Sequence, residues 1–242
     1  MAIEPSRILV NFLKTNLTDP NSSRSGSDWI YPDFPRTDDL NINSFPRIGI
    51  TKITESGDRL GIYDDSTWEN LSYQIDVITK KGLVCTITQT DDSLGTISND
   101  PRLKFDYIPT TVTNIKHNGS AFGTVTQVAT DALFTAPASL PAGTVQWSYS
   151  TGHLNFSSAD LASYSGQTIT STYSSKMEGH KLTEYLARRI VYYLRTSWRT
   201  DTTFSGLYYP VKIDNSPMPF EEQTGIFRHK LEYKFNAINT GE

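Results

Sequence analysis

The residues with the clearest potential for chemistry are arginines that recur at regular intervals near the end of the chain. Arg188, Tyr192, Arg195 and Arg199 follow one another at steps of three or four residues, which places their side chains on one face of an α-helix. Two interpretations stay open. The face can be solvated, with arginine stems covering apolar surface. It can instead contact the acidic groups of a neighbouring subunit, or nucleic acid that passes nearby.

The other reactive residue types lack the partners that catalysis or metal binding requires. The four histidines are His117, His153, His180 and His229. No two of them have the spacing of a metal-binding pair, so we expect dispersed surface or capping roles. The sequence has no Gly-x-Ser-x-Gly motif and no Gly-rich phosphate loop. Cys85 stands alone in an apolar run, as expected of a buried structural thiol. We therefore expect no catalytic residue, no metal site and no cofactor.

Acidic residues occur as four adjacent pairs. These pairs are Asp38-Asp39, Asp64-Asp65, Asp91-Asp92 and Glu221-Glu222. Paired carboxylates can bind a cation or act as acid and base. Each pair falls in a predicted turn, where such side chains favour local hydrogen bonds to the backbone, so we expect turn structure and not chemistry.

The length, composition and net charge of the chain restrict the class of protein. A chain of 242 residues predicts one or two domains, and 37% hydrophobic with 12% aromatic residues supports a packed core. A net charge of −4 argues against nucleic-acid binding as the global role, although a local basic patch remains compatible with it. There is no signal-peptide pattern and no apolar run of about 18 residues, so we expect a protein without membrane contact that is made in the cytoplasm.

Apolar periodicity predicts a scaffold of two helices and several strands. Apolar residues from Ile8 to Leu17 predict the first helix, and those over 180–199 predict the second. Predicted strands cover 48–53, followed by a turn at 56–58, and 73–80, which should be half-buried. The closing run 226–238 alternates apolar and charged residues, which predicts a strand that is solvated or edge-paired on its polar face.

A long proline-containing loop, residues 20–46, joins the first helix to the first strand. It carries the aromatic residues Trp29, Tyr31 and Phe34, which are unusual in a mere connection. They should pack on their own domain or on a neighbour, and we expect contacts to a neighbouring subunit.

The segment from Gly82 to Ser175 differs in composition from the rest of the chain. It is rich in Ser, Thr and Gly, and predicted strands recur in it at 83–89, 111–117, 122–128, 144–149, 153–156 and 167–173. Turn residues separate these strands, including the hairpin signal Asn118-Gly119. The pattern is typical of a small β-sandwich. We therefore predict an α+β fold: a small mixed or antiparallel sheet packed by two helices (1–81 and 176–242), with an inserted all-β, sandwich-like domain (82–175).

The order of elements outside the insert resembles a known family. The strings that carry the resemblance are 8–13, 46–50, 73–77, 182–187 and the closing alternating strand. They are similar to the tail-terminator or tail-completion (neck) proteins of long-tailed phages and archaeal tailed viruses. In the insert, 143–147, 152–160 and 166–173 resemble β-domains common in virion structural proteins.

The resemblance implies a structural function. Subunits of that family form a ring, commonly a hexamer, at the head-proximal end of the tail, where the ring ends tail-tube growth and joins the head connector. The implied partners are further copies of the chain, the tail-tube protein and the connector or stopper protein, with DNA passing through the lumen. The implied location is the virion neck, after assembly in the host cytoplasm. The alternatives are another neck or baseplate component, a β-domain that binds a ligand or glycan, and an enzyme without recognisable motifs.

Overall fold

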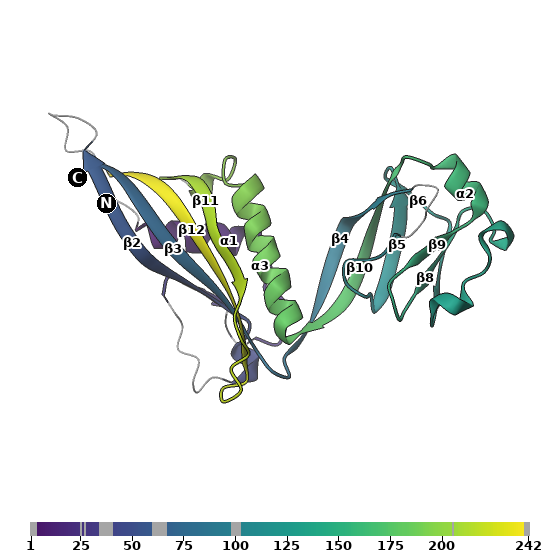
Figure 1. Cartoon of the computed structure of the whole chain (residues 1–242), viewed down its shortest axis with the longest axis horizontal. Coiled ribbons are helices and arrows are strands. Elements are labelled where there is room, and N and C mark those ends of the chain that lie inside the picture. Colours follow the sequence, from purple (N-terminus) through teal and green to yellow (C-terminus); the bar gives the residue numbers. More distant parts are fainter. Residues whose placement is uncertain are drawn as a thin grey trace. The chain divides into compact units, whose positions relative to one another are not determined.

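The structure is a computed structural model that describes residues 4–24, 26, 28–33, 41–59, 67–97, 103–204 and 206–239 (Figure 1). It is a mixed fold in which strands dominate, with three sheets among the described residues. The chain divides into two compact units. One comprises Met1–Cys85 with Met177–Glu242, and the other is Thr86–Lys176; the sequence places the insert at 82–175.

The first unit is built on a five-stranded sheet. In spatial order its strands are β1 (Ile30–Tyr31), β2 (Arg47–Arg59), β3 (Thr67–Lys80), β12 (Ile226–Asn239) and β11 (Leu207–Pro217). The short β1 is parallel to β2, and every other pair is antiparallel. Segments far apart in the sequence, β3 and β12, therefore lie side by side at its centre (Figure 1).

Two helices cover one face of this sheet. In α1 (Pro5–Asn16) and α3 (Gly179–Thr196) the predicted apolar stripes are buried, including Phe12 in α1 and Leu186 in α3. Phe12 packs edge-on against Phe204, and Phe204 in turn contacts Phe235 of β12. Gly179, the first residue of α3, lies against Phe227, which is also in β12. The core thus lies between the helices and the alternate residues of β12.

Strand β12 differs in part from its prediction. It lies between β3 and β11, so the edge-paired alternative is wrong, whereas its charged residues are partly or well exposed, as the solvated alternative predicts. Its polar side chains are held in ion pairs, with Arg228 Nε 2.8 Å from Asp76 Oδ1 and Lys230 Nζ 3.3 Å from Glu232 Oε2. Asp76 is 0% exposed, so the centre of β3 is covered on both faces and not half-buried as predicted.

The predicted turn at 56–58 is also wrong. Strand β2 continues through these residues, and Ser56, Gly57 and Asp58 pair with Asn70, Glu69 and Trp68 of β3. The connection between the two strands falls at 60–66, outside the described residues, and so does the acidic pair Asp64-Asp65.

The second unit contains the two smaller sheets. The first has the order β4 (Val84–Thr96), β10 (Thr168–Glu178), β5 (Thr111–His117) and β6 (Ser120–Ala121); the second has β7 (Thr124–Val128), β8 (Thr144–Ser148) and β9 (Leu154–Phe156). These strands confirm the six predicted ones, and the predicted Asn118-Gly119 hairpin joins β5 to β6 with both turn residues at positive φ. β7 and β8 run parallel.

One hydrophobic cluster draws side chains from both sheets of this unit, among them Ile115, Trp147, Phe156 and Tyr173. The unit is not all-β as predicted, because α2 (Ser158–Ser163) and the 3-10 turns Asp131–Leu133 and Pro137–Ser139 lie between its strands. Ser157 caps α2 by accepting a hydrogen bond from the Asp160 amide at 3.0 Å.

Candidate functional site

The predicted arginine face lies on the solvent side of α3. Leu182, Leu186, Ile190 and Leu194 turn inward and are at most 1% exposed, whereas Arg188, Tyr192 and Arg195 are exposed. The helix ends at Thr196, so Arg199 lies in the following turn and not on the helix as predicted. Its guanidinium lies 5.3 Å from the centroid of the Trp198 ring.

The exposed arginines of this face make local contacts. Arg188 Nη2 donates to Glu184 Oε1 at 2.7 Å, one turn earlier in α3. Both side chains are well exposed, so such a pair contributes only about 0.3–0.5 kcal/mol. The pair with Glu184 therefore adds little to the stability of the helix.

Sequence reasoning missed a fourth arginine, Arg189. Its Nη2 donates to the Tyr193 hydroxyl at 2.6 Å, and its guanidinium lies 5.6 Å from the centroid of the Tyr192 ring. Tyr192 itself is 53% exposed. The spacing of Arg189, Tyr192 and Tyr193 on a helix was the available signal, because residues three and four apart are neighbours on a helix surface.

The aromatic residues of the long loop pack on their own unit. Trp29 is 4% exposed, and its carbonyl accepts from the Ile48 amide at 2.8 Å where β1 meets β2. Tyr31 lies under the Arg47 guanidinium, 4.6 Å from its ring centroid. The expected contact of Trp29 with a neighbouring subunit is therefore corrected: it belongs to the subunit's core. Phe34 lies outside the described residues.

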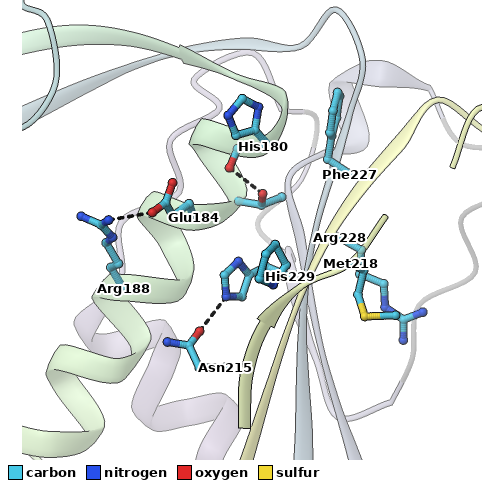
Figure 2. Close-up of a pocket in the computed structure, with 10 residues that line it drawn as sticks. His180, Glu184, Arg188, Asn215, Met218, Phe227, Arg228 and His229 are labelled. Carbon is cyan, nitrogen blue, oxygen red and sulfur yellow. Dashed lines mark hydrogen bonds and ion pairs between the residues drawn. The ribbon is translucent and has the colours of Figure 1, made fainter. Parts of the chain in front are cut away.

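A pocket of about 410 Å³ lies beside the arginine face, between the first half of α3 and the β11–β12 hairpin (Figure 2). The residues that line it are His180, Thr183, Glu184 and Arg188 from α3, Asn215, Pro217 and Met218 from β11 and its end, and Phe227, Arg228 and His229 from β12. Figure 2 shows His229 and Asn215 between the helix and the strands, joined by a hydrogen bond. Arg188 thus belongs both to the arginine face and to this pocket.

The charged groups of the pocket are already engaged. Arg228 pairs with buried Asp76, and Arg188 pairs with Glu184. Burial lowers the pKa of His229, which favours a neutral imidazole whose Nε2 donates to Asn215 Oδ1 at 2.6 Å. The pocket is therefore close to neutral overall, with apolar surface from Met218 and Phe227.

The hydroxyl that lines the pocket belongs to Thr183. It donates to the His180 carbonyl at 2.8 Å and so satisfies a helix backbone group. Among the described lining residues no hydroxyl is hydrogen-bonded to an imidazole or carboxylate as an activated nucleophile would be.

The acidic pairs take structural roles where the structure describes them. The turn predicted at Asp91-Asp92 is wrong, because both residues lie within strand β4. Asp91 pairs with Lys116 at 2.7 Å, and Asp92 accepts from the Tyr173 hydroxyl at 2.9 Å. Glu221 accepts from Thr224 in a turn. Asp38-Asp39 lies outside the described residues. Among the described residues, no group of three or more His, Cys, Asp or Glu side chains could hold a metal ion.

One histidine has a partner that spacing along the sequence did not reveal. His153 Nδ1 lies 2.7 Å from Asp131 Oδ2, although the residues are 22 positions apart. Hydrogen bonds from His153, Thr151 and Ser148 lower the pKa of Asp131 to about 2. Both side chains are 40% exposed, so the pair lies at the surface of the second unit.

The most distinctive surface is the outer edge of β11. We call it the β11 edge surface: Tyr208, Tyr209, Val211 and Ile213, continued by Met218 and Phe220, each between 37% and 58% exposed. Half of the large hydrophobic side chains that are exposed in the described part of the chain lie in this short stretch. Exposed apolar side chains gathered in one stretch of chain are typical of interaction sites. Pro210 within an apolar run was the sequence signal for an edge strand.

Searches against protein-family models, curated protein sequences and solved structures find no match to this chain. None of the helices in the described ranges has the length and apolar character needed to cross a membrane.

Proposed function

We propose that the protein is a virion structural protein of a tailed virus. It forms a ring, as a hexamer, at the head-proximal end of the tail, where it ends the growth of the tail tube and joins the tail to the head connector. In this proposal its function is assembly and not catalysis. Its partners are further copies of itself, the tail-tube protein and the connector or stopper protein, and DNA passes through the lumen.

The observation that carries the proposal is the β11 edge surface. An edge strand presents unpaired backbone N–H and C=O groups to solvent. In β11 these groups accompany exposed apolar side chains such as Val211 (57%) and Ile213 (52%). Burying these backbone groups and apolar side chains against another chain would lower the free energy of the subunit. The exposed edge therefore supports a protein that assembles.

Two further features support the ring. The first unit has the element order on which the resemblance to tail-terminator proteins rests: helix, loop, strands, helix, strands. We interpret it as a small, largely antiparallel sheet packed by two helices, and the second unit as an inserted, sandwich-like domain. A ring also repeats Arg188 and Arg195 around its axis. A modest basic face on one subunit then becomes a strong positive electrostatic potential at the contacts between subunits or in the lumen of the ring.

Native mass spectrometry, with and without tail tubes from the virus that encodes the chain, tests the proposal. We expect a closed cyclic species, either in the free protein or on tube ends. The tubes should also stop elongating when the protein is added. A protein that stays monomeric at all concentrations and leaves tube growth unchanged would contradict the proposal.

A further inference from the structure

We propose that the ring closes by strand pairing, with β11 of one subunit running antiparallel beside β2 of the next. The inference rests on the proposed function, because it states how the proposed ring is held together. The occupant of the β11 edge surface is therefore a second copy of this chain, which contributes its opposite sheet edge.

The first observation is that the sheet is open at both ends. On the outer side of β2, β1 pairs only with Ile48 and Gly49. From Ile50 onward no strand in the described part of the chain adjoins that side, and β11 pairs only with β12. Within the described ranges each subunit therefore has two sheet edges, along β2 from Ile50 onward and along β11, that no further strand covers.

The second observation is the direction of the strands. β2, β3, β12 and β11 follow one another across the sheet, each antiparallel to the next, so β2 and β11 run in opposite directions. When a second subunit continues the sheet, its β2 meets β11 as an antiparallel neighbour. Such a contact joins two different surfaces of the same chain, and it closes into a ring when the rotation per subunit closes.

The third observation is a shared pattern along the two edges. On β2, Lys52 is followed by Ile53 and then by Glu55; on β11, Lys212 is followed by Ile213 and Asp214. Ile53 is 44% and Ile213 is 52% exposed. The strand partners of Lys212 and Glu55 place these two side chains on the same face of the sheet. In antiparallel apposition Lys212 of one edge therefore approaches Glu55 of the other, which pairs with Lys52 within β2, and the isoleucines lie beside them. Asp214 lies on the opposite face from Lys52, so these two do not pair. Opposite charges and apolar pairs across strands both stabilise such a ladder.

The fourth observation is that both edges bulge at the isoleucine. The register of β2 on β3 shifts between Lys52 and Thr54, and that of β11 on β12 shifts between Lys212 and Asp214. A bulge bends the strand and increases its twist. Edges that bend at the same residue of the pattern can follow each other there. β11 has a second shift, between Tyr208 and Val211, without a counterpart on β2, so the inferred pairing covers residues 211–217 of β11.

Disulfide trapping tests this inference. In a Cys85→Ser background, which removes the one native thiol, the double variant Ile53→Cys/Ile213→Cys is oxidised under ring-forming conditions, with tail tubes present where the ring needs them. We expect non-reducing gels to show a ladder at multiples of the 27.1 kDa chain mass. Shifting the cysteines to Thr54 and Lys212 scans the neighbouring registers, because a disulfide needs Cα atoms within about 7 Å.

The control is Tyr149→Cys combined with Ile213→Cys, because Tyr149 is 49% exposed and lies in the other compact unit. It should give no ladder. Ile213→Cys alone should give no dimer; a dimer would mean that β11 pairs with β11 across a two-fold axis, and would overturn the inference. Rings by native mass spectrometry without a ladder in any register would also overturn it, while leaving the proposed function standing. Absence of any ring would overturn both.

Discussion

Arginine side chains have two opposite roles in this subunit. Arg24 has a side chain that is 4% exposed; it pairs with Asp19 and donates to the carbonyls of Ser44 and Pro46 at 2.5 and 2.6 Å. Arg188 and Arg195 lie in solvent on α3. The first kind holds a loop in place, since buried carbonyls need donors. The second kind lies at the surface, where other molecules can reach it.

Replacing Arg188, Arg195 and Arg199 together with Gln should lower assembly but not stability. Exposed substitutions away from special features change stability by less than about 0.5 kcal/mol each, so thermal melting should be nearly unchanged. Ring formation, or the yield of infectious particles, should fall because the repeated positive field is lost. Wild-type assembly would indicate a solvated face, and a large loss of melting temperature would indicate pairing within the subunit.

Arg24→Gln provides the matched contrast to that triple variant. It leaves buried carbonyl groups without their donor, a change that costs about 1–3 kcal/mol per group. We expect a clear fall in melting temperature, measured by calorimetry. An unchanged melting temperature would mean that the loop it holds does not contribute to the stability of the first unit.

The Asp131–His153 pair should appear in the acid titration of the second unit. Its folded pKa of about 2 lies below the ordinary value of 3.8, so the pair stabilises the fold above that ordinary value, and the contribution is lost as pH falls from there through about 2. His153→Ala should raise the pKa of Asp131 toward 3.8, measured by carboxyl NMR, with Thr151 and Ser148 still lowering it in part. His117→Ala, whose ring stacks on Tyr164, is the control. An unchanged Asp131 pKa in His153→Ala would contradict the assignment.

At the scale of elements, the junction between β10 and α3 is tightly constrained at Gly179. Gly179 begins the helix with a φ of +52°, and a Cβ there would lie 2.9 Å from Cε2 of Phe227. Both the left-handed backbone and the close ring require glycine. The junction sets where α3 begins on the sheet, and hence where Thr183 and Glu184 meet the pocket.

Gly179→Ala should therefore destabilise the first unit more than Gly225→Ala. Gly225 also has a positive φ, +67°, but its nearest contact would be an ordinary 3.7 Å from Lys81 Cβ. Each variant carries a backbone cost of about 1 kcal/mol, and only Gly179→Ala adds the clash. Urea unfolding measures both; equal losses would show that Phe227 moves aside freely.

At the scale of the whole molecule, the chain consists of two compact units, and the second is inserted into the first. The hydrophobic cluster around Phe156 and Tyr173 consists of residues of the second unit alone. The first unit has its own core around Phe12, Leu186 and Phe235. Each unit thus has the core that an independently folding domain needs.

Replacing Thr86–Lys176 with a short Gly/Ser linker should leave the first unit folded. Its sheet contains no strand from the second unit. The linker would join Cys85 directly to Met177, the residues at which the chain leaves and re-enters the first unit. Far-UV circular dichroism and cooperative urea unfolding of the shortened chain measure the outcome, with the isolated segment 86–176 as its counterpart. An insoluble or non-cooperative shortened chain would show that the first unit depends on the insert.

Local residue order determined a large part of this protein. The apolar stripes of α1 and α3, the strands of the second unit and the Asn118-Gly119 hairpin could all be predicted, because helix and strand periodicity and turn residues act over a few positions. The composition of 82–175 also indicated an inserted unit. The ring function, which the resemblance suggested and the β11 edge surface supports, stays a proposal.

Only the tertiary structure decided which of these elements meet the solvent. β12 alternates as an exposed strand would, yet β11 forms beyond it and takes the edge. Trp29 lies in a loop but is buried, and Asp131 meets His153 across 22 residues. The physical reason is the same in each case. Burial and pairing depend on which distant segment packs alongside, and the free energy of that packing is not contained in the periodicity of either segment.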